Sequence, residues 1–338
     1  MATFFTDFYN STALPGLFAD PVLLVKTLIM YVIIGALFYL AVVKKFEPLL
    51  LLPIAFGMLL ANIPGANLFH MDLFIHEDGS PIDIQTIVEQ GNLLDFLYLG
   101  VKLGIYPSII FMGVGAMTDF TSLIANPKSL LLGAAAQFGV FAAFIGALFL
   151  GFTPEQASSI GIIGGADGPT AILVTKTLAP ELLGAIAIAA YSYMALIPII
   201  QPPFMKMLTT KEERAIVMTN LRSVSKVEKV LFPIVVTLIV CIIVPDATPL
   251  VGFLMLGNLF NVCGVADRLS KTAQNEFMNI VTICLGVSVG ATANADNFLA
   301  LDTLKIIFLG LAAFCLSTVG GLVGGKIMCW ATKGKSIP

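Results

Sequence analysis

One carboxylate stands inside an apolar stretch of this chain. Asp167 lies in the run Gly164-Gly165-Ala166-Asp167-Gly168-Pro169-Thr170, in a sequence that is 58% hydrophobic and only 12% charged. An ionisable side chain at membrane depth costs about 2.5 to 3.5 kcal/mol on insertion scales and usually marks a functional site. Three glycines and a proline beside it disfavour a continuous helix. Broken backbone is tolerated inside a bilayer where it is buried in protein or lines a cavity. The run therefore predicts an ion site at an interrupted helix.

The residue types in this run suit Na⁺. A hard cation prefers oxygen ligands, and Asp167 offers a carboxylate, Thr170 a hydroxyl, and Gly164 and Gly165 carbonyls released from helical bonding. Half-helix ends add partial charges at the break. Asp167 would bind Na⁺ when ionised or carry a proton when neutral, which is the basis of ion exchange. The plainer alternative is an aspartate that caps a helix beside a kink.

A second polar group follows in the next apolar segment. Tyr191, Ser192 and Tyr193 interrupt this segment, and a tyrosine hydroxyl there would bind Asp167 or pass on a proton. Packing explains the two tyrosines almost equally well. Asn258 is a further candidate Na⁺ ligand through its amide oxygen, or a cap of a short helix. We therefore predict Asp167 and Tyr193 as catalytic residues, with Gly164, Gly165, Thr170, Tyr191, Ser192 and Asn258 as additional Na⁺-binding residues.

Composition narrows the class of protein. The net charge of −3 comes without a basic stripe and gives no indication of nucleic-acid binding. The five cysteines are scattered and lack metal-ligand spacing, so they are interpreted as small buried thiols. His70 and His76 share a polar loop, which favours solvation over a metal pair. The sequence predicts an all-α, polytopic membrane protein.

Apolar runs long enough to cross a bilayer lie near residues 22–43, 95–118, 128–150, 182–205 and 304–331. The broken segment 154–178 is predicted to be a re-entrant hairpin. If residues 1–21 form an interfacial segment outside, most of the 18 Lys and Arg residues fall on the cytoplasmic side. Lys26, Lys102, Lys176 and Lys305 are the exceptions. The basic loop 206–229 lies inside only if the hairpin is re-entrant, so the charges support it independently.

The two halves of the chain resemble each other. Pro53 and Asn62 have the spacing of Pro249 and Asn258, and Gly115-Ala116 reappears as Gly290-Ala291. We predict a first repeat over 22–205 and an inverted second repeat over 230–338, as in many secondary transporters. A similar shift would place the start of a second broken hairpin at the last residue, so the second repeat is expected to be incomplete here.

The runs Gly164 to Thr170, Ala190 to Met194 and Asn279 to Gly290 resemble the β subunit of biotin-dependent, sodium-translocating decarboxylases. This family acts on oxaloacetate, methylmalonyl-CoA or glutaconyl-CoA. The resemblance implies decarboxylation of carboxybiotin, coupled to Na⁺ export and consumption of a proton. It implies that Asp167 binds Na⁺ and that the Tyr193 hydroxyl takes part in ion or proton binding. The family's second motif, which begins Asn-Pro-Leu-Ile-Gly, would start just after Pro338.

The resemblance also implies partners and a location. A soluble biotin-carrying carboxyltransferase subunit and a small single-span membrane subunit would join this chain in the cytoplasmic membrane of a prokaryote, and homo-oligomers are conceivable. Loop 206–229 would dock a soluble acidic partner or serve only as an orientation signal. The rival hypotheses are a stand-alone Na⁺/H⁺ antiporter or Na⁺-coupled carrier, and a non-catalytic membrane anchor.

Overall fold

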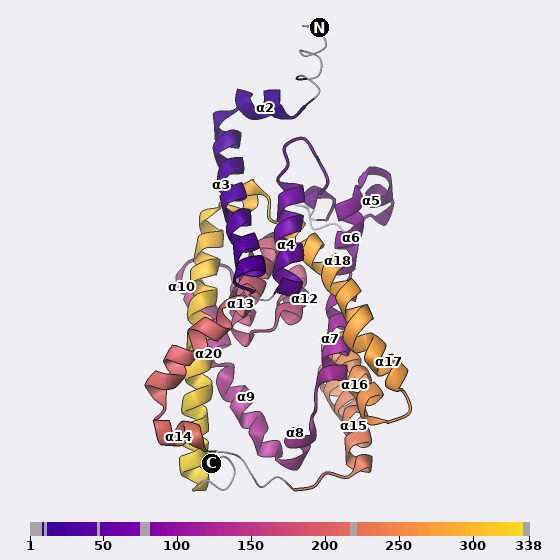
Figure 1. The fold of residues 1–338 in the computed structure, drawn as a ribbon, viewed down its shortest axis with the longest axis vertical. Coiled ribbons are helices and arrows are strands. Elements are labelled where there is room, and N and C mark those ends of the chain that lie inside the picture. The colour runs from indigo at the N-terminus through magenta and orange to yellow at the C-terminus, as the bar shows by residue number, and fades with distance from the viewer. Residues whose placement is uncertain (1–8, 10–11, 46–47, 75–81, 217–221, 334–338) are drawn as a thin grey trace.

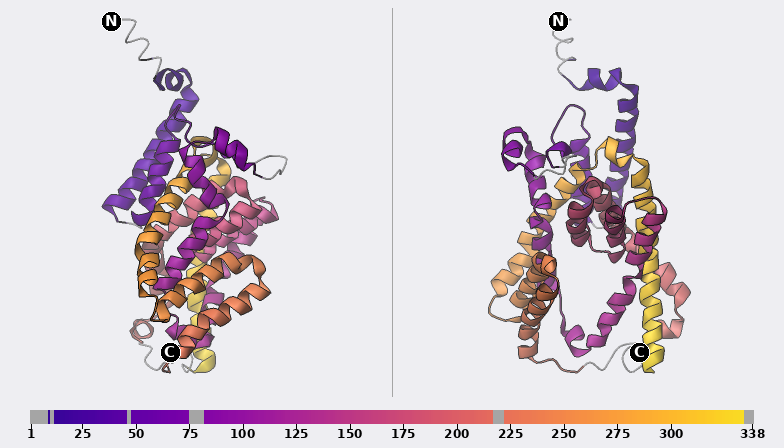
Figure 2. Two further views of the ribbon diagram at one scale, coloured as in Figure 1. Left: turned by 90° about the vertical axis from the view of Figure 1, so that its right-hand side faces the viewer. Right: turned by 180° about the vertical axis from the view of Figure 1, so that it is seen from behind.

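The computed structural model describes residues 9, 12–45, 48–74, 82–216 and 222–333. Every regular element in these ranges is a helix, which confirms the all-α prediction. The molecule is elongated, with α2 near one end and the end of α20 near the other (Figure 1). The ribbon views show the helices gathered into two groups, with α12 and α13 between them (Figures 1 and 2).

The helices of residues 12–149 precede the predicted break. They are α2 (Leu14–Ala19), α3 (Pro21–Phe38), η1 (Tyr39–Val43), α4 (Pro48–Ala61), η2 (Met71–Leu73), α5 (Ile84–Gln90), α6 (Leu93–Lys102), α7 (Ile105–Met117), α8 (Thr121–Ala125), η3 (Pro127–Ser129), α9 (Leu130–Ala136) and α10 (Phe138–Phe149).

The helices of the remaining chain include the break itself. They are α11 (Pro154–Gly161), η4 (Ile162–Gly165), α12 (Gly168–Leu178), η5 (Pro180–Leu182), α13 (Leu183–Leu208), α14 (Lys211–Ala215), α15 (Lys226–Ile243), η6 (Pro245–Ala247), α16 (Thr248–Val262), α17 (Asp267–Thr272), η7 (Ala273–Phe277), α18 (Met278–Ala291), α19 (Ala295–Phe298) and α20 (Leu301–Thr332).

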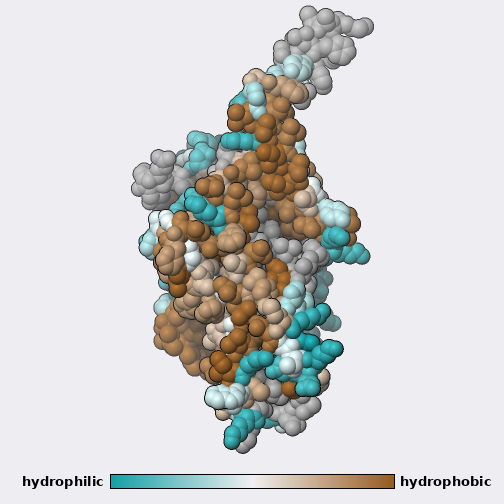
Figure 3. Space-filling model, turned by 90° about the vertical axis from the view of Figure 1, so that its left-hand side faces the viewer, coloured by the Kyte–Doolittle hydropathy of each residue, from teal (hydrophilic) through white to brown (hydrophobic). Residues whose placement is uncertain are grey.

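Several of these helices are long and apolar enough to cross a membrane. Pro21–Val43, Pro127–Phe149 and Leu301–Thr332 qualify individually, and α6 with α7 qualifies as one span bent by 63°. These four spans coincide with four of the five long apolar runs in the sequence, and α13 covers the remaining run, 182–205. Large apolar side chains face outward, including Phe149 at 87% and Trp330 at 84% exposure. Apolar atoms cover most of one face, with hydrophilic atoms gathered toward its lower end (Figure 3). Such a surface suits contact with lipid tails.

Two apolar cores hold the helices together. The first joins α3, α4, α6, α7 and α18 through side chains such as Met30, Ile54 and Leu285. The second joins α10, α11, α12, α13 and α20 through Ile160, Ile186 and other buried residues. The segment that carries Asp167 belongs to the second core, while the inner face of α12 also contributes to the first.

Two helix pairs pack unusually closely, α4 with α18 and α7 with α16. A Cβ atom added at Gly57 of α4 would lie 2.2 Å from the carbonyl oxygen of Val287. A Cβ added at Gly257 of α16 would lie 1.9 Å from the carbonyl oxygen of Met112. Small residues at both crossings let the backbones touch, as is common between membrane helices.

The reciprocal contacts match as well. A Cβ added at Gly290 would lie 2.1 Å from the carbonyl oxygen of Ile54, and one added at Gly115 would lie 1.8 Å from that of Leu254. Each pair therefore takes one helix from either half of the chain, with a glycine of each helix against the backbone of the other. Duplicated halves related by a two-fold axis would pack in this crossed way. The observation supports the predicted duplication, which stays a prediction.

Candidate cation site

The backbone is interrupted at the predicted place. α11 begins with a capping box between Thr153 and Gln156 and narrows into the 3₁₀ turn η4. Ala166 then takes a left-handed conformation (φ 55°, ψ 35°), and Asp167 is extended (φ −125°, ψ 95°) before α12 begins at Gly168. Left-handed backbone is costly for a residue with a Cβ, so the surrounding packing must hold it in place. The result is two half-helices that meet at Asp167.

Asp167 is the N-cap of α12 and is half-buried. One carboxylate oxygen accepts from the backbone N–H of Thr170 at 3.3 Å, and the other accepts from the Thr170 hydroxyl at 2.6 Å. The capping interpretation is thus correct as far as geometry goes. A carboxylate has about four acceptor positions, so capping leaves oxygen lone pairs that a cation can use. Thr170 is brought to Asp167 as the Na⁺-site hypothesis requires.

Gly164 and Gly165 have different surroundings. A Cβ added at Gly164 would lie 2.8 Å from the backbone of Gly139 and Val140 on α10, so the half-helix is pressed directly against that helix. The Gly164 carbonyl accepts from the Ser317 hydroxyl of α20 at 2.6 Å. At Gly165 the nearest atom would be the Gln137 Oε1, at 3.5 Å. Gly164 is therefore required for packing, whereas Gly165 lies beside open space.

That space is a cavity of about 300 Å³ at the end of η4. Its polar lining consists of two carboxamides, Gln137 and Gln201, and two hydroxyls, Ser317 and Thr318. The cavity gives the broken backbone access to small polar ligands or water. Its wall is completed by Ala136, Gly164, Gly165, Ala166, Ile197, Met205, Phe314, Gly321 and Leu322.

The sequence analysis missed all four polar lining residues, Gln137, Gln201, Ser317 and Thr318. A single serine or glutamine in an apolar helix is a weak signal, because such residues often bond to their own helix. Thr318 does this, donating to the Phe314 carbonyl at 3.0 Å. Only the fold shows that Ser317 reaches the broken segment.

Other predicted site residues lie elsewhere or outside the described atoms. The side chains of Tyr191, Ser192 and Tyr193 lie outside the described residues, although their backbone belongs to α13. Asn258 is buried between α16 and α7. Its Nδ2 donates to the carbonyls of Thr118 at 2.8 Å and Gly115 at 3.3 Å. Its hydrogen bonds therefore join two helices and do not reach the Asp167 segment.

Further polar residues have structural roles. Asp119 lies just before α8 and accepts from the hydroxyl and the N–H of Thr121, which hold its pKa below the ordinary value. His70 Nδ1 lies 2.8 Å from the buried carboxylate of Asp95, and His76 falls outside the described residues. Within the described ranges, no three His, Cys, Asp or Glu side chains gather as a metal site would require. A site with one carboxylate suits a monovalent cation better than a transition metal.

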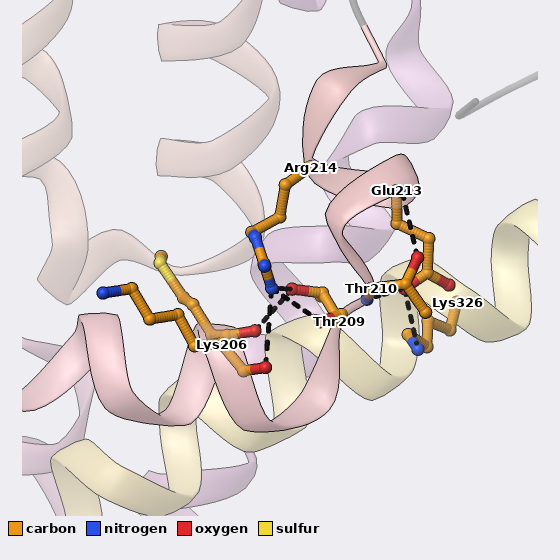
Figure 4. A network of polar contacts seen from close by, with 7 residues as sticks. Lys206, Thr209, Thr210, Glu213, Arg214 and Lys326 are labelled. Carbon is orange, nitrogen blue, oxygen red and sulfur yellow. Dashed lines mark hydrogen bonds and ion pairs between the residues drawn. The ribbon is translucent and has the colours of Figure 1, made fainter.

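The predicted basic loop contains a short helix fixed to α20. Arg214 Nη1 donates to the Thr209 carbonyl at 2.6 Å, and Glu213 pairs with Lys326 at 3.1 Å (Figure 4). The Thr210 N–H, followed by the Lys326 side chain, holds the pKa of the exposed Glu213 carboxyl below its ordinary value. These contacts fix the start of the loop beside the end of α20.

Comparison with known proteins identifies the family of this chain. Residues 26–338 match the family model of the Na⁺-transporting oxaloacetate decarboxylase beta subunit. Methylmalonyl-CoA decarboxylase subunit beta of Propionigenium modestum is 55% identical over 95% of this chain and 82% of its own length. The glutaconyl-CoA decarboxylase subunit beta of Acidaminococcus fermentans is 54% identical over 89% and 76%. The oxaloacetate decarboxylase beta chain of Klebsiella pneumoniae is 50% identical over 89% and 79%. The chain therefore belongs to the family of Na⁺-transporting decarboxylase beta subunits.

Proposed function

We propose that the chain binds Na⁺ at the break between η4 and α12 and exports it while carboxybiotin is decarboxylated. The observation that carries this proposal is a single half-buried carboxylate, Asp167, at a helix break. The Thr170 hydroxyl lies 2.6 Å from it. Gly165 and Ala166 line a cavity of about 300 Å³, and their carbonyls are candidate ligands. Together they supply the oxygen ligands that a hard cation needs.

Exchange of Na⁺ for a proton at Asp167 couples the two events. The ionised carboxylate holds Na⁺, and protonation of the same oxygens removes the negative charge that holds it. Loss of CO₂ from carboxybiotin requires a proton at the biotin nitrogen, which we infer returns through the site from the outer side. Tyr193, on α13, is our candidate for passing this proton.

The remaining parts of the complex are assigned by resemblance. A soluble biotin-carrying carboxyltransferase subunit would bring carboxybiotin to the cytoplasmic face, and a small single-span subunit would join the two. The excess of Lys and Arg in the sequence of loop 206–229 makes it a candidate docking segment for a soluble acidic partner, and Arg214 near its start donates to the Thr209 carbonyl. The names of the relatives differ in the acid that is decarboxylated. We therefore infer that a partner subunit chooses the acid.

The location follows the charge pattern. The apolar spans place the chain in a membrane, and the positive-inside bias favours an N-terminus outside. The resemblance implies that this membrane is the cytoplasmic membrane of a prokaryote.

Asp167→Asn tests the proposed site. The amide keeps the shape of the side chain but loses the charge that holds Na⁺, so Na⁺-dependent decarboxylation and Na⁺ uptake into inverted vesicles should fall by at least about 100-fold. The assay uses the assembled complex in proteoliposomes. Protection of the membrane subunit by Na⁺ against proteolysis should disappear as well.

Two further results separate the rival functions. Na⁺ flux that continues when avidin blocks the biotin group would indicate an antiporter and not a decarboxylase-driven pump. Unchanged Na⁺ dependence in Asp167→Asn would remove the assignment of the site.

A further inference from the structure

Lys176 lies at the opposite end of the helix that Asp167 begins. α12 runs from Gly168 to Leu178, with Asp167 as its N-cap and Lys176 in its last turn. At 1.5 Å per residue this helix is a rod about 16 Å long. A constraint on the lysine end therefore limits where the carboxylate end can lie.

The lysine end of α12 meets a second break in the fold. α6 and α7 meet at an angle of 63°, and the bend passes through Gly104, whose φ is +79°. The last carbonyls of a helix have no partner within it, and that of Lys102 ends α6. Lys176 Nζ donates to this carbonyl at 3.1 Å. Its ammonium thus replaces the hydrogen bond that the bend removes.

The fit around the ammonium is close. A Cβ added at Gly104 would lie 2.5 Å from Lys176 Nζ, so the ammonium occupies the room that a side chain would need. Lys176 forms no ion pair with a described carboxylate, and a carbonyl at the negative end of α6 is its described partner. The contact therefore depends on the geometry of the bend.

A second lysine extends this contact to Phe74, the residue that follows η2. Lys102 Nζ donates to the Phe74 carbonyl at 2.9 Å. Phe74 packs edge-on against Tyr98, with ring centroids 4.7 Å apart, and the Tyr98 side chain is buried in the first core. Lys176 thus joins α12, which carries the candidate site, to helices of the first core.

We propose that Lys176 is a positioning residue that holds α12, and with it Asp167, in register with the α6–α7 bend. The proposal rests on the proposed Na⁺ site at Asp167. Lys176 does not touch the ion in this assignment. It sets the affinity of the site by fixing the rod on which the carboxylate is mounted, and it ties occupancy of the site to the bend.

Lys176→Met tests this role, because methionine keeps the apolar stem and removes the ammonium. In the assembled complex in proteoliposomes, we expect the Na⁺ concentration for half-maximal decarboxylation to rise about tenfold, the loss of one charge-assisted hydrogen bond. The rate at saturating Na⁺ should change by less than about threefold. Lys176→Arg, which keeps a donor, should restore most of the affinity. Lys305→Met, which removes a lysine paired with the exposed Asp302, is the matched control.

A second variant covers the case in which Lys176→Met does not fold. Gly104→Ala keeps the lysine but fills its place, and it adds the strain of a Cβ at positive φ. Gly151→Ala carries the same kind of strain at φ +90° with nothing within 4 Å of the added atom. We expect weaker Na⁺ binding in the first variant only.

The outcomes separate this proposal from the one on which it rests. An unchanged Na⁺ requirement in Lys176→Met with a lowered melting temperature would show a purely structural lysine and overturn the inference. Equal Na⁺ requirements in Gly104→Ala and Gly151→Ala would do the same. Either result beside a loss of Na⁺ dependence in Asp167→Asn leaves the Na⁺ site intact and removes only the role of Lys176.

Discussion

The helix pairs α4·α18 and α7·α16 pack in the same way. They differ in the segment that precedes α18 in one pair and α7 in the other. In both pairs a glycine approaches a backbone carbonyl from each side. α18 follows directly from the π-helical turn η7, so its chain runs on without a sharp bend. α7 follows a 63° bend at Gly104, and Lys176 of α12 fills that bend. The two pairs therefore differ at the bend before α7, where α12, the helix that begins after Asp167, makes its contact.

Closely packed glycines have two different roles in this molecule: some only let helices approach, and one also lies where a helix ends. Gly57 and Gly257 lie inside continuous helices, where their carbonyls stay within the helix and only closeness is gained. Gly164 also packs against a neighbouring backbone, with an added Cβ 2.8 Å from it, but its helix ends there, and its carbonyl accepts from Ser317 of α20. Close packing is therefore shared by all three positions, and a freed backbone is found only at the candidate site.

The largest effect is expected where the crossings are closest. Gly57→Ala and Gly257→Ala each place a methyl group about 2 Å from a backbone oxygen of the partner helix. Backbone cannot move aside as a side chain can, so we expect each to lower the free energy of unfolding by about 3 kcal/mol. Thermal unfolding of the purified subunit in detergent measures this.

Two glycines supply the control for this experiment. Gly35 on α3 and Gly252 on α16 have nothing within 4 Å of an added Cβ. Alanine there should be neutral or should raise stability by up to about 1 kcal/mol. A large loss at Gly257 with none at Gly57 would contradict the equivalence of the two pairs and weaken the case for duplication.

The next effect compares neighbouring glycines at the break. Gly164→Ala would push α11 and η4 away from α10, so we expect a loss of about 1–3 kcal/mol in stability together with weaker Na⁺ binding. Gly165→Ala fits beside Gln137 at 3.5 Å and should retain both properties. Isothermal titration with Na⁺ and thermal unfolding distinguish the two. Similar behaviour of both variants would show that the tight contact with α10 is not what holds the break.

The sequence was enough to predict the helical class, most spans and the position of the break. These features depend on composition and local backbone chemistry: apolar length gives a span, and Gly-Pro punctuation around Asp167 interrupts a helix. It also placed Thr170 and Asp167 in one site, because their hydroxyl and carboxylate are the oxygen ligands that a hard cation prefers.

Contacts between distant segments could not be predicted. Ser317 lies on α20, far along the chain from the Gly164 carbonyl that it binds. Lys176 looked like one of four basic exceptions to the topology, and only the fold places its ammonium at the α6–α7 bend. Asn258 was an even choice between ligand and cap. Its residue type suits both roles, and tertiary packing decides which carbonyls lie within reach.

The smallest effect is expected at Asn62 and Asn258. Comparing alanine variants of these two asparagines tests whether Asn258 is an ion ligand or a structural residue. Asn62 donates to the Ala293 carbonyl at 2.8 Å beyond α18, and Asn258 donates to the Thr118 carbonyl at 2.8 Å beyond α7. Alanine at either position takes the amide donor away from a buried or half-buried carbonyl, so we expect each to cost about 1–2 kcal/mol of stability. Because both amides join helices within their own pairs, the half-saturating Na⁺ concentration should stay the same in both variants. A rise for Asn258→Ala that is absent for Asn62→Ala would show instead that the second pair contributes a ligand to the ion.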